Sequence, residues 1–230
     1  MNENALENVY LKFFESFQVD SVTGILSQYP SVKFITMPYI GSKYYESKRK
    51  ILFVGMDVGK DETPGRYQSI SDRNMNIECD KNFNPHIAGT YCSSLFLLKD
   101  IYNWSDVWEC FSKFQTYSQA TKHINHKIGE NPLSYVALTN LHKFVTINRE
   151  NRAGDLDRKF LERDIEESLF LEEIKILKPE IILFQGKIPS LKTINQIKEL
   201  DIQILKSFHP SYRKKGGRKP DVYVKSFVEI

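Results

Sequence analysis

Polar residues that could do chemistry stand directly after four short apolar runs of the sequence. They are Asp57, Asn140, Gln185, His209 and Ser211. A carboxylate such as Asp57 can stabilise a developing cation, and a histidine such as His209 can donate a hydrogen bond to a leaving group that gains negative charge. A hydroxyl such as that of Ser211 can bond a phosphate oxygen. The set predicts one site if the fold brings these side chains together.

A basic segment follows His209 and adds a second kind of chemistry. Between Lys206 and Pro220 the chain carries six cations and no acid. Gly216 and Gly217 interrupt the cations, so the segment is predicted to be a cationic loop that can bind phosphate. The alternative is a solvated surface loop without a ligand.

Four apolar runs are expected to form the strands that position these residues. They are Ile51–Gly55, Ser134–Asn140, Glu180–Phe184 and Ile202–Phe208. Short apolar runs bounded by Gly, Pro or polar turns are typical of parallel strands covered on both faces. The carboxyl ends of such strands form the ligand-binding edge of the sheet, so the polar residues should meet at one cleft.

Helical patterns lie between the expected strands. Leu156–Leu177 has a broad apolar stripe with charges on its other face, and Ser190–Leu200, Cys92–Tyr102 and Ala5–Phe17 are three further candidates. Alternation of strands and helices predicts a three-layer α/β/α domain over residues 1–230, with a central four-stranded parallel sheet in the order 2-1-3-4. Residues 1–49 are expected to be a helical extension packed on it.

Two short motifs do not meet the requirements of the sites that they resemble. The string Gly55–Asp61 has one residue too few between its glycines for a phosphate loop, and Asp61 replaces the Ser or Thr that would bind magnesium. His123 and His126 are three residues apart but have no carboxylate or Cys nearby, which is too few ligands for a metal. The sequence therefore predicts neither a nucleotide triphosphatase nor a metal site.

Composition narrows the class of protein. The chain has 230 residues, a net charge of +3 and 41% hydrophobic residues, as expected of a globular domain. No apolar run reaches the length needed to span a bilayer, and the first residues do not resemble a secretory signal. Three separated cysteines fit neither a disulfide framework nor a metal site. These features predict a cytoplasmic monomer without membrane contact.

The four strand ends together resemble the uracil-DNA glycosylase superfamily. Its first motif, G-x-(D/N/A)-P-(Y/G), is matched by Gly55–Gly59, although Val58 replaces the usual Pro. A T-N-aliphatic-aliphatic-K string after the second strand is matched by Thr139–Lys143, and H-P-(S/A) is matched by His209–Ser211. The order and spacing fit from Ile51 to about Lys215.

This resemblance implies roles for individual residues. Asp57 matches the position that activates or orients water, and His209 matches the residue that bonds the base carbonyl as negative charge grows on it. Asn140 matches the residue that reads the Watson–Crick edge of a flipped base. Gly55 and Met56 of the first motif are expected to line the base site.

The resemblance also implies DNA, single- or double-stranded, as the partner. Ser211 matches a serine that grips a phosphate, and Tyr212–Lys219 matches the loop that enters the duplex. The cations expected to contact phosphate are Arg213, Lys214, Lys215 and Lys219.

One aromatic side chain should stack on the flipped base. Tyr67, Phe83 and His86 are the candidates, and His86 lies closest to the family's position. Phe144 and roughly Glu166 stand where members with an iron–sulfur cluster have cysteines, so no cluster and no other cofactor are expected.

The resemblance implies a DNA glycosylase that hydrolytically excises a damaged or deaminated base of the uracil type. The alternative is a non-catalytic module on the same fold that binds nucleic acid or a nucleotide. A third possibility is an unrelated hydrolytic enzyme with Asp57 and His209 as an acid–base pair, although the sequence lacks a G-x-S-x-G nucleophile string.

Overall fold

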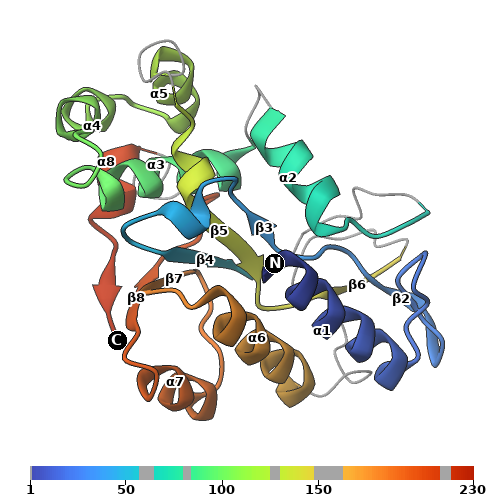
Figure 1. Ribbon diagram of the computed structural model, residues 1–230. Coiled ribbons are helices and arrows are strands. Elements are labelled where there is room, and N and C mark those ends of the chain that lie inside the picture. The colour runs from blue at the N-terminus through green and yellow to red at the C-terminus, as the bar shows by residue number, and fades with distance from the viewer. Residues whose placement is uncertain (1, 57–64, 80–83, 125–129, 148–162, 213–218) are drawn as a thin grey trace.

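A six-stranded sheet forms the centre of the molecule in the computed structural model, which describes residues 2–56, 65–79, 84–124, 130–147, 163–212 and 219–230 (Figure 1). The strands lie in the order β3-β5-β4-β7-β8-β9. Their bounds in that order are Tyr39–Ile40, Val136–Asn140, Ile51–Gly55, Ile181–Gln185, Gln203–Ser207 and Val228–Glu229. Strands β5, β4, β7 and β8 are mutually parallel, and β3 and β9 are antiparallel at the two edges.

The mixed α/β class is confirmed, but the expectation of a four-stranded, wholly parallel sheet is not. The sheet has two additional antiparallel strands, each two residues long. Such short edge strands carry too few residues to show an apolar run or an alternation, so sequence patterns miss them. The four expected runs lie in the parallel part, and β4, β5 and β7 are buried along their whole length.

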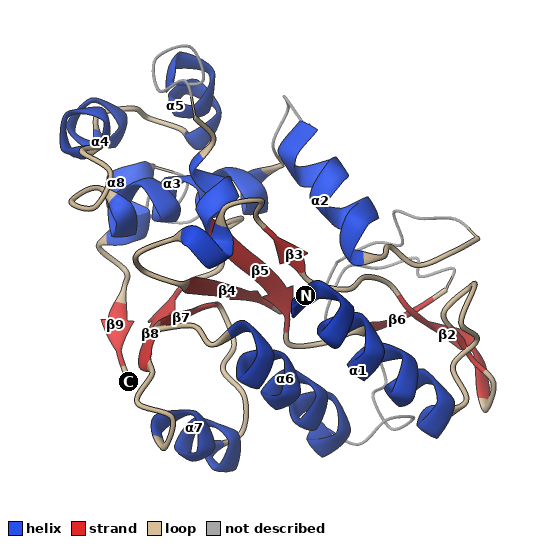
Figure 2. Cartoon of the chain, viewed as in Figure 1, coloured by secondary structure: helices blue, strands red, loops and turns tan. Residues whose placement is uncertain are grey.

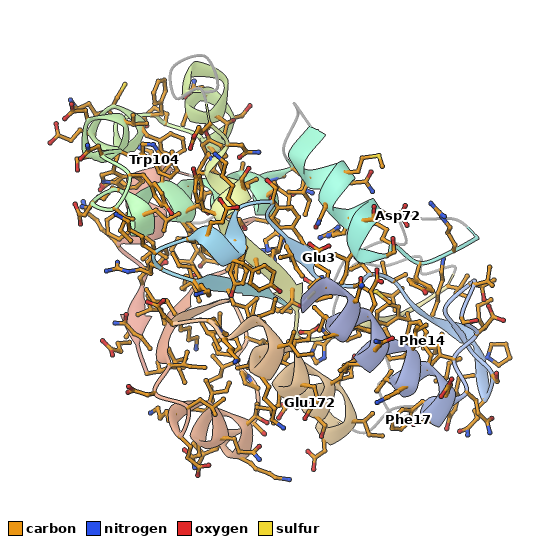
Figure 3. All side chains as sticks on the ribbon, in the orientation of Figure 1. Glu3, Phe14, Phe17, Asp72, Trp104 and Glu172 are labelled. Carbon is orange, nitrogen blue, oxygen red and sulfur yellow. The ribbon has the colours of Figure 1, made fainter. Side chains whose placement is uncertain are left out.

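Helices cover both faces of this sheet (Figure 2). On one face α1 packs on α6, and a hydrophobic cluster that includes residues of both helices and of α7 covers the strands. The bounds are Asn2–Phe17 for α1, Arg163–Leu177 for α6 and Leu191–Lys198 for α7. Figure 3 shows Phe14 and Phe17 on α1, and Phe14 is 1% exposed.

The opposite face carries the remaining helices around a second hydrophobic cluster. Their bounds are Ile70–Cys79 for α2, Pro85–Leu98 for α3, Ser105–Ser112 for α4, Tyr117–Ile124 for α5 and Pro220–Val224 for α8. Helix α3 packs against α4, α5 and α8, and Trp104 lies among these helices, 7% exposed (Figure 3). Two 3-10 turns, η1 (Tyr44–Glu46) and η2 (Pro132–Tyr135), complete the connections.

The N-terminal segment is more than the expected helical extension. After α1 it contributes β1 (Ile25–Leu26) and β2 (Tyr29–Phe34), which form an antiparallel sheet with β6 (Phe144–Thr146). It then supplies β3 to the central sheet. Residues 1–49 are therefore part of the fold itself. Among the described helices, none has the length and apolar character that a bilayer crossing requires.

Candidate functional site

The carboxyl ends of β4 and β5 lie side by side and bring Asn140 close to the backbone of Gly55. The two residues are partners in the parallel register, and Leu141 N–H donates to the Gly55 carbonyl over 2.8 Å. A Cβ atom at position 55 would lie 2.6 Å from Asn140 Oδ1, so a larger residue at this strand end would displace the Asn140 side chain. Asn140 is 4% exposed, and no hydrogen bond from its amide group is found within the described residues.

Helix α3 brings His86 to the same place. The Asn84 side chain caps the helix by accepting from the N–H groups of His86 and Ile87, and Pro85 occupies the first helical position. His86 Cε1 lies 3.0 Å from the position of a Cβ at Gly55. The helix begins seven residues before the expected start at Cys92, because the Asn84-Pro85 capping signal marks its first turn. This earlier start places His86 over the strand ends.

Gln185, the last residue of β7, fixes the tautomer of His86. His86 Nε2 lies 2.8 Å from Gln185 Oε1, and the Gln185 Nε2 atom donates to Thr90 Oγ1 and to Tyr223 OH, each over 3.1 Å. The Thr90 hydroxyl lies 3.1 Å from the His86 carbonyl and 3.4 Å from Gln185 Oε1, so its proton goes to the nearer carbonyl and it accepts from Gln185 Nε2. The amide oxygen of Gln185 is therefore left for His86, whose Nε2 must carry the proton.

The far end of this network supports the same assignment. The Ser207 hydroxyl donates to the Phe208 carbonyl over 3.0 Å, so its contact of 3.1 Å with Tyr223 OH makes Tyr223 the donor. Tyr223 can then accept from Gln185 Nε2. Each hydroxyl in this series of hydrogen bonds donates once, and the series ends on the backbone carbonyls of His86 and Phe208. Nδ1 of His86 is thus left without a proton.

His86 stays neutral at ordinary pH. Desolvation, with smaller contributions from the nearby His209 and Arg73, lowers the pKa of His86 to about 3, and the hydrogen bond with Gln185 opposes this shift. A protonated His86 would place a positive charge against the His209 ring. The group therefore acts as a neutral hydrogen-bonding side chain and not as an acid.

This depressed pKa predicts a pH-dependent stability. The folded chain excludes a proton that the unfolded chain binds below pH 6.5, so the contribution is complete above that pH and is lost as the pH falls toward about 3. Each pH unit of that window should cost up to about 1.4 kcal/mol. Urea unfolding of wild type and His86→Phe between about pH 6.5 and 4.5 measures it. The variant should show the shallower slope, and equal slopes would contradict the prediction.

His209 lies against His86 and has the same tautomer, with its proton on Nε2. Their rings are stacked with centroids 5.4 Å apart and planes 16° apart. The backbone N–H of Ser211 donates to His209 Nδ1 over 3.1 Å, so in the neutral ring the proton is on Nε2. Nε2 of His209 is thus protonated, whereas Nδ1 of His86 is an unprotonated acceptor.

Two glycines permit this close packing. A Cβ at Gly89 of α3 would lie 2.5 Å from Pro210 Cβ, so α3 is pressed directly on the His209-Pro210 turn. Gly186, after β7, has a φ of +124°, and a Cβ there would lie 3.3 Å from Met56 Sδ and 3.7 Å from His209 Cβ. Met56, Gly186 and His209 are therefore neighbours.

The structure thus brings together most of the predicted residues that it describes. We call Gly55, His86, Asn140, Gln185 and His209 the strand-end cluster, with Met56 and Ser211 beside it. Lys219 immediately precedes α8. Four predicted site residues lie outside the described part of the chain: Asp57, Arg213, Lys214 and Lys215.

The candidates for a stacking aromatic lie in different places. Tyr67 packs in the first hydrophobic cluster, with its ring centroid 5.2 Å from that of Phe14 and 5.5 Å from that of Phe34. Phe83 lies outside the described residues. His86 is the candidate found in the strand-end cluster.

A buried ionic network next to Asn140 was not predicted from the sequence. Lys143 Nζ lies 2.7 Å from Glu173 Oε1 and donates to Thr139 Oγ1 over 2.6 Å, and both charged side chains are at most 1% exposed. Thr139 and Tyr10 donate to the two oxygens of the same carboxylate. Burial lowers the pKa of Lys143, and Glu173 opposes this shift. The network links α1 and α6 to β5, the strand that carries Asn140.

A second carboxylate of α6 holds the loop after β5. Glu166 accepts from the backbone N–H of Lys143 over 2.7 Å and lies 3.1 Å from His142 Nδ1. His142 N–H donates to the Met56 carbonyl over 2.8 Å. This pair therefore steadies the connection that follows Asn140.

No group of three or more His, Cys, Asp or Glu side chains within the described ranges could hold a metal ion. The hydrogen-bonding groups of the strand-end cluster are neutral amides and imidazoles. Such a set can bind the polar edge of an uncharged ring compound. The chain matches no protein-family model and no curated protein sequence.

Proposed function

We propose that this protein is a DNA glycosylase-like enzyme that flips a damaged or deaminated base of the uracil type and hydrolyses its bond to deoxyribose. The observation that carries the proposal is the tautomer of His209, set by the Ser211 N–H group. It places the ring proton of His209 on Nε2, and Asn140, which is 4% exposed, lies in the same strand-end cluster. The sequence resemblance to uracil-DNA glycosylases supports the same function.

The chemistry needs a donor where negative charge develops. Cleavage of the N-glycosidic bond leaves an anionic base and an oxocarbenium-like sugar. The His209 Nε2–H group would stabilise the base anion, and the Asn140 amide would bind its edge. Asp57, by its place directly after β4, would stabilise the sugar cation and orient the water. Flipping costs a few kcal/mol, which contacts inside the site would offset.

One assay tests the proposal directly. Labelled oligonucleotides that carry uracil, hypoxanthine, xanthine or a mismatch are incubated with the protein, and abasic sites are scored after alkaline cleavage. We expect strand breaks at one or more of these bases in single- or double-stranded DNA. If every oligonucleotide stays uncleaved, the catalytic proposal is wrong.

A non-catalytic binding module is the second candidate, and one observation favours it. The described hydrogen-bonding groups of the cluster are neutral, since His86 has its pKa lowered to about 3 and the others are amides and a neutral imidazole donor. Neutral groups are sufficient to bind a base or nucleotide without cleaving it. Protein that binds the same oligonucleotides but leaves no abasic sites would support this candidate.

The basic segment provides a separate prediction about DNA affinity. Replacing Arg213, Lys214, Lys215 and Lys219 with Ala should weaken binding to all sequences alike, because phosphate contacts carry no base information. Each lost contact should reduce the slope of log K against log salt by about 0.9. Fluorescence anisotropy at several salt concentrations measures that slope. Replacing Lys192 and Lys198 of α7 with Ala is the control, because it removes positive charge at another place. If each replaced cation changes the salt slope equally in the two sets, the basic segment is not a specific phosphate contact.

A further inference from the structure

We propose that His86 is a specificity-determining residue whose unprotonated Nδ1 accepts a hydrogen bond from a ring N–H of the bound base. The base class it would take is a lactam, in which a ring N–H stands next to a carbonyl, as in uracil, hypoxanthine and xanthine. This inference rests on the proposed function. It changes the role expected for His86 from a stacking face to a hydrogen-bonding edge.

The first support is that the hydrogen bond to Gln185 sets the tautomer of His86. Gln185 uses its amide oxygen on His86 Nε2 because its amide nitrogen is already committed to Thr90 and Tyr223. His86 cannot move its proton to Nδ1 without breaking the 2.8 Å bond to Gln185. Three side chains, from α3, β7 and α8, therefore hold one nitrogen as an acceptor.

The second support is the direction of the ring. Nε2 points to Gln185 at the end of β7, and Cε1 lies over Gly55 at the end of β4. Nδ1 is on the other side of Cε1 from Nε2, and β5 lies on the other side of β4 from β7. Asn140 Oδ1 lies 2.6 Å from the same Gly55 Cβ position that Cε1 approaches. Nδ1 is bonded to Cε1, the ring atom that lies nearest to this position, and no hydrogen bond to Nδ1 is found within the described residues.

The third support is that the polar groups of the cluster complement one another. His86 offers an acceptor on Nδ1, and the Asn140 amide offers one donor and one acceptor. A lactam edge presents a donor next to an acceptor and can satisfy this set. A base methylated on that ring nitrogen would leave the buried acceptors unpaired and would add a methyl group against them.

The test begins with the tautomer. Nitrogen-15 NMR of the uniformly labelled protein should show one proton on His86 Nε2 and none on Nδ1, with no change between pH 5 and 8 because burial lowers the pKa of His86 to about 3. A proton on Nδ1 would overturn the inference, whether or not the protein has glycosylase activity.

The second arm compares free uracil with 3-methyluracil as probes, each titrated at millimolar concentrations and followed by NMR. Wild type should bind uracil about tenfold more tightly than 3-methyluracil, as expected when one buried hydrogen bond is lost. His86→Phe keeps a flat ring but has no acceptor, so the two probes should bind within about twofold of each other. His86→Asn keeps an oxygen near the position of Nδ1 and should restore part of the preference.

The outcomes separate this inference from the proposed function. If His86→Phe still prefers uracil tenfold, Asn140 alone reads the ring N–H and the inference fails, even for an active glycosylase. If wild type shows the preference but cleaves no DNA, the role of His86 stands and the catalytic proposal fails. If wild type binds neither probe, the inference is overturned.

Discussion

Replacing Lys143 with Met should lower the free energy of unfolding by about 3–5 kcal/mol, the usual cost of leaving a buried charge without its partner. Glu173 is fully buried, and Lys143 is the cation that it contacts, over 2.7 Å. Methionine fills a similar volume, so the loss would come from the charge and not from a cavity. Tyr10 and Thr139 would still donate to the carboxylate, but they cannot neutralise it.

Urea unfolding followed by circular dichroism measures this effect, and the same helix provides a matched control. Lys175 pairs with Glu172 over 2.5 Å on the solvent side of α6, where the two side chains are 58% and 47% exposed (Figure 3). Lys175→Met should change the unfolding free energy by less than about 0.5 kcal/mol. The double variant Lys143→Met with Glu173→Gln should recover part of the loss, because no unpaired charge remains. Equal effects of Lys143→Met and Lys175→Met would show that the buried pair is not a stabilising partnership.

The parallel strands were accessible from the sequence because burial on both faces leaves a direct trace. Ile51–Gly55 and Ile181–Gln185 are continuous apolar runs that end on small or polar residues. The edge strands β3 and β9 leave no such trace, since two residues of backbone pairing require no particular side chains. The start of α3 did have a local signal in Asn84-Pro85, and reading it would have placed His86 on the helix from the beginning.

The buried network could not be predicted in the same way. Lysine is almost always exposed, and only its contact with Glu173, 30 residues later in the chain, makes the burial of Lys143 tolerable. The same holds for the strand-end cluster. Sequence order alone brings Asn140 and His209 to one edge of a parallel sheet. The tautomers of the two histidines depend on Gln185, Thr90 and a backbone N–H group, which only the folded chain brings into place.

If the protein excises a base, His209→Ala should slow cleavage on the order of 10²–10³-fold, the usual loss when one preorganised donor is removed. The Nε2–H group of His209 would act on charge that develops only in the transition state. The loss should therefore appear in the rate of the chemical step and leave DNA affinity nearly unchanged. Single-turnover cleavage with excess enzyme measures that rate, and anisotropy measures the affinity.

Ser211→Ala is the matched control for this prediction. The Ser211 group that sets the His209 tautomer is its backbone N–H, which alanine keeps, so the donor on His209 should survive. If the Ser211 hydroxyl grips a phosphate, its loss should weaken DNA binding and spare the chemical rate, the reverse of the His209 pattern. Equal losses of rate in both variants would mean that the substitutions disturb the His209-Pro210 turn as a whole. A variant His209→Ala with full activity would place the donor for the leaving base elsewhere and remove the observation on which the proposed function rests.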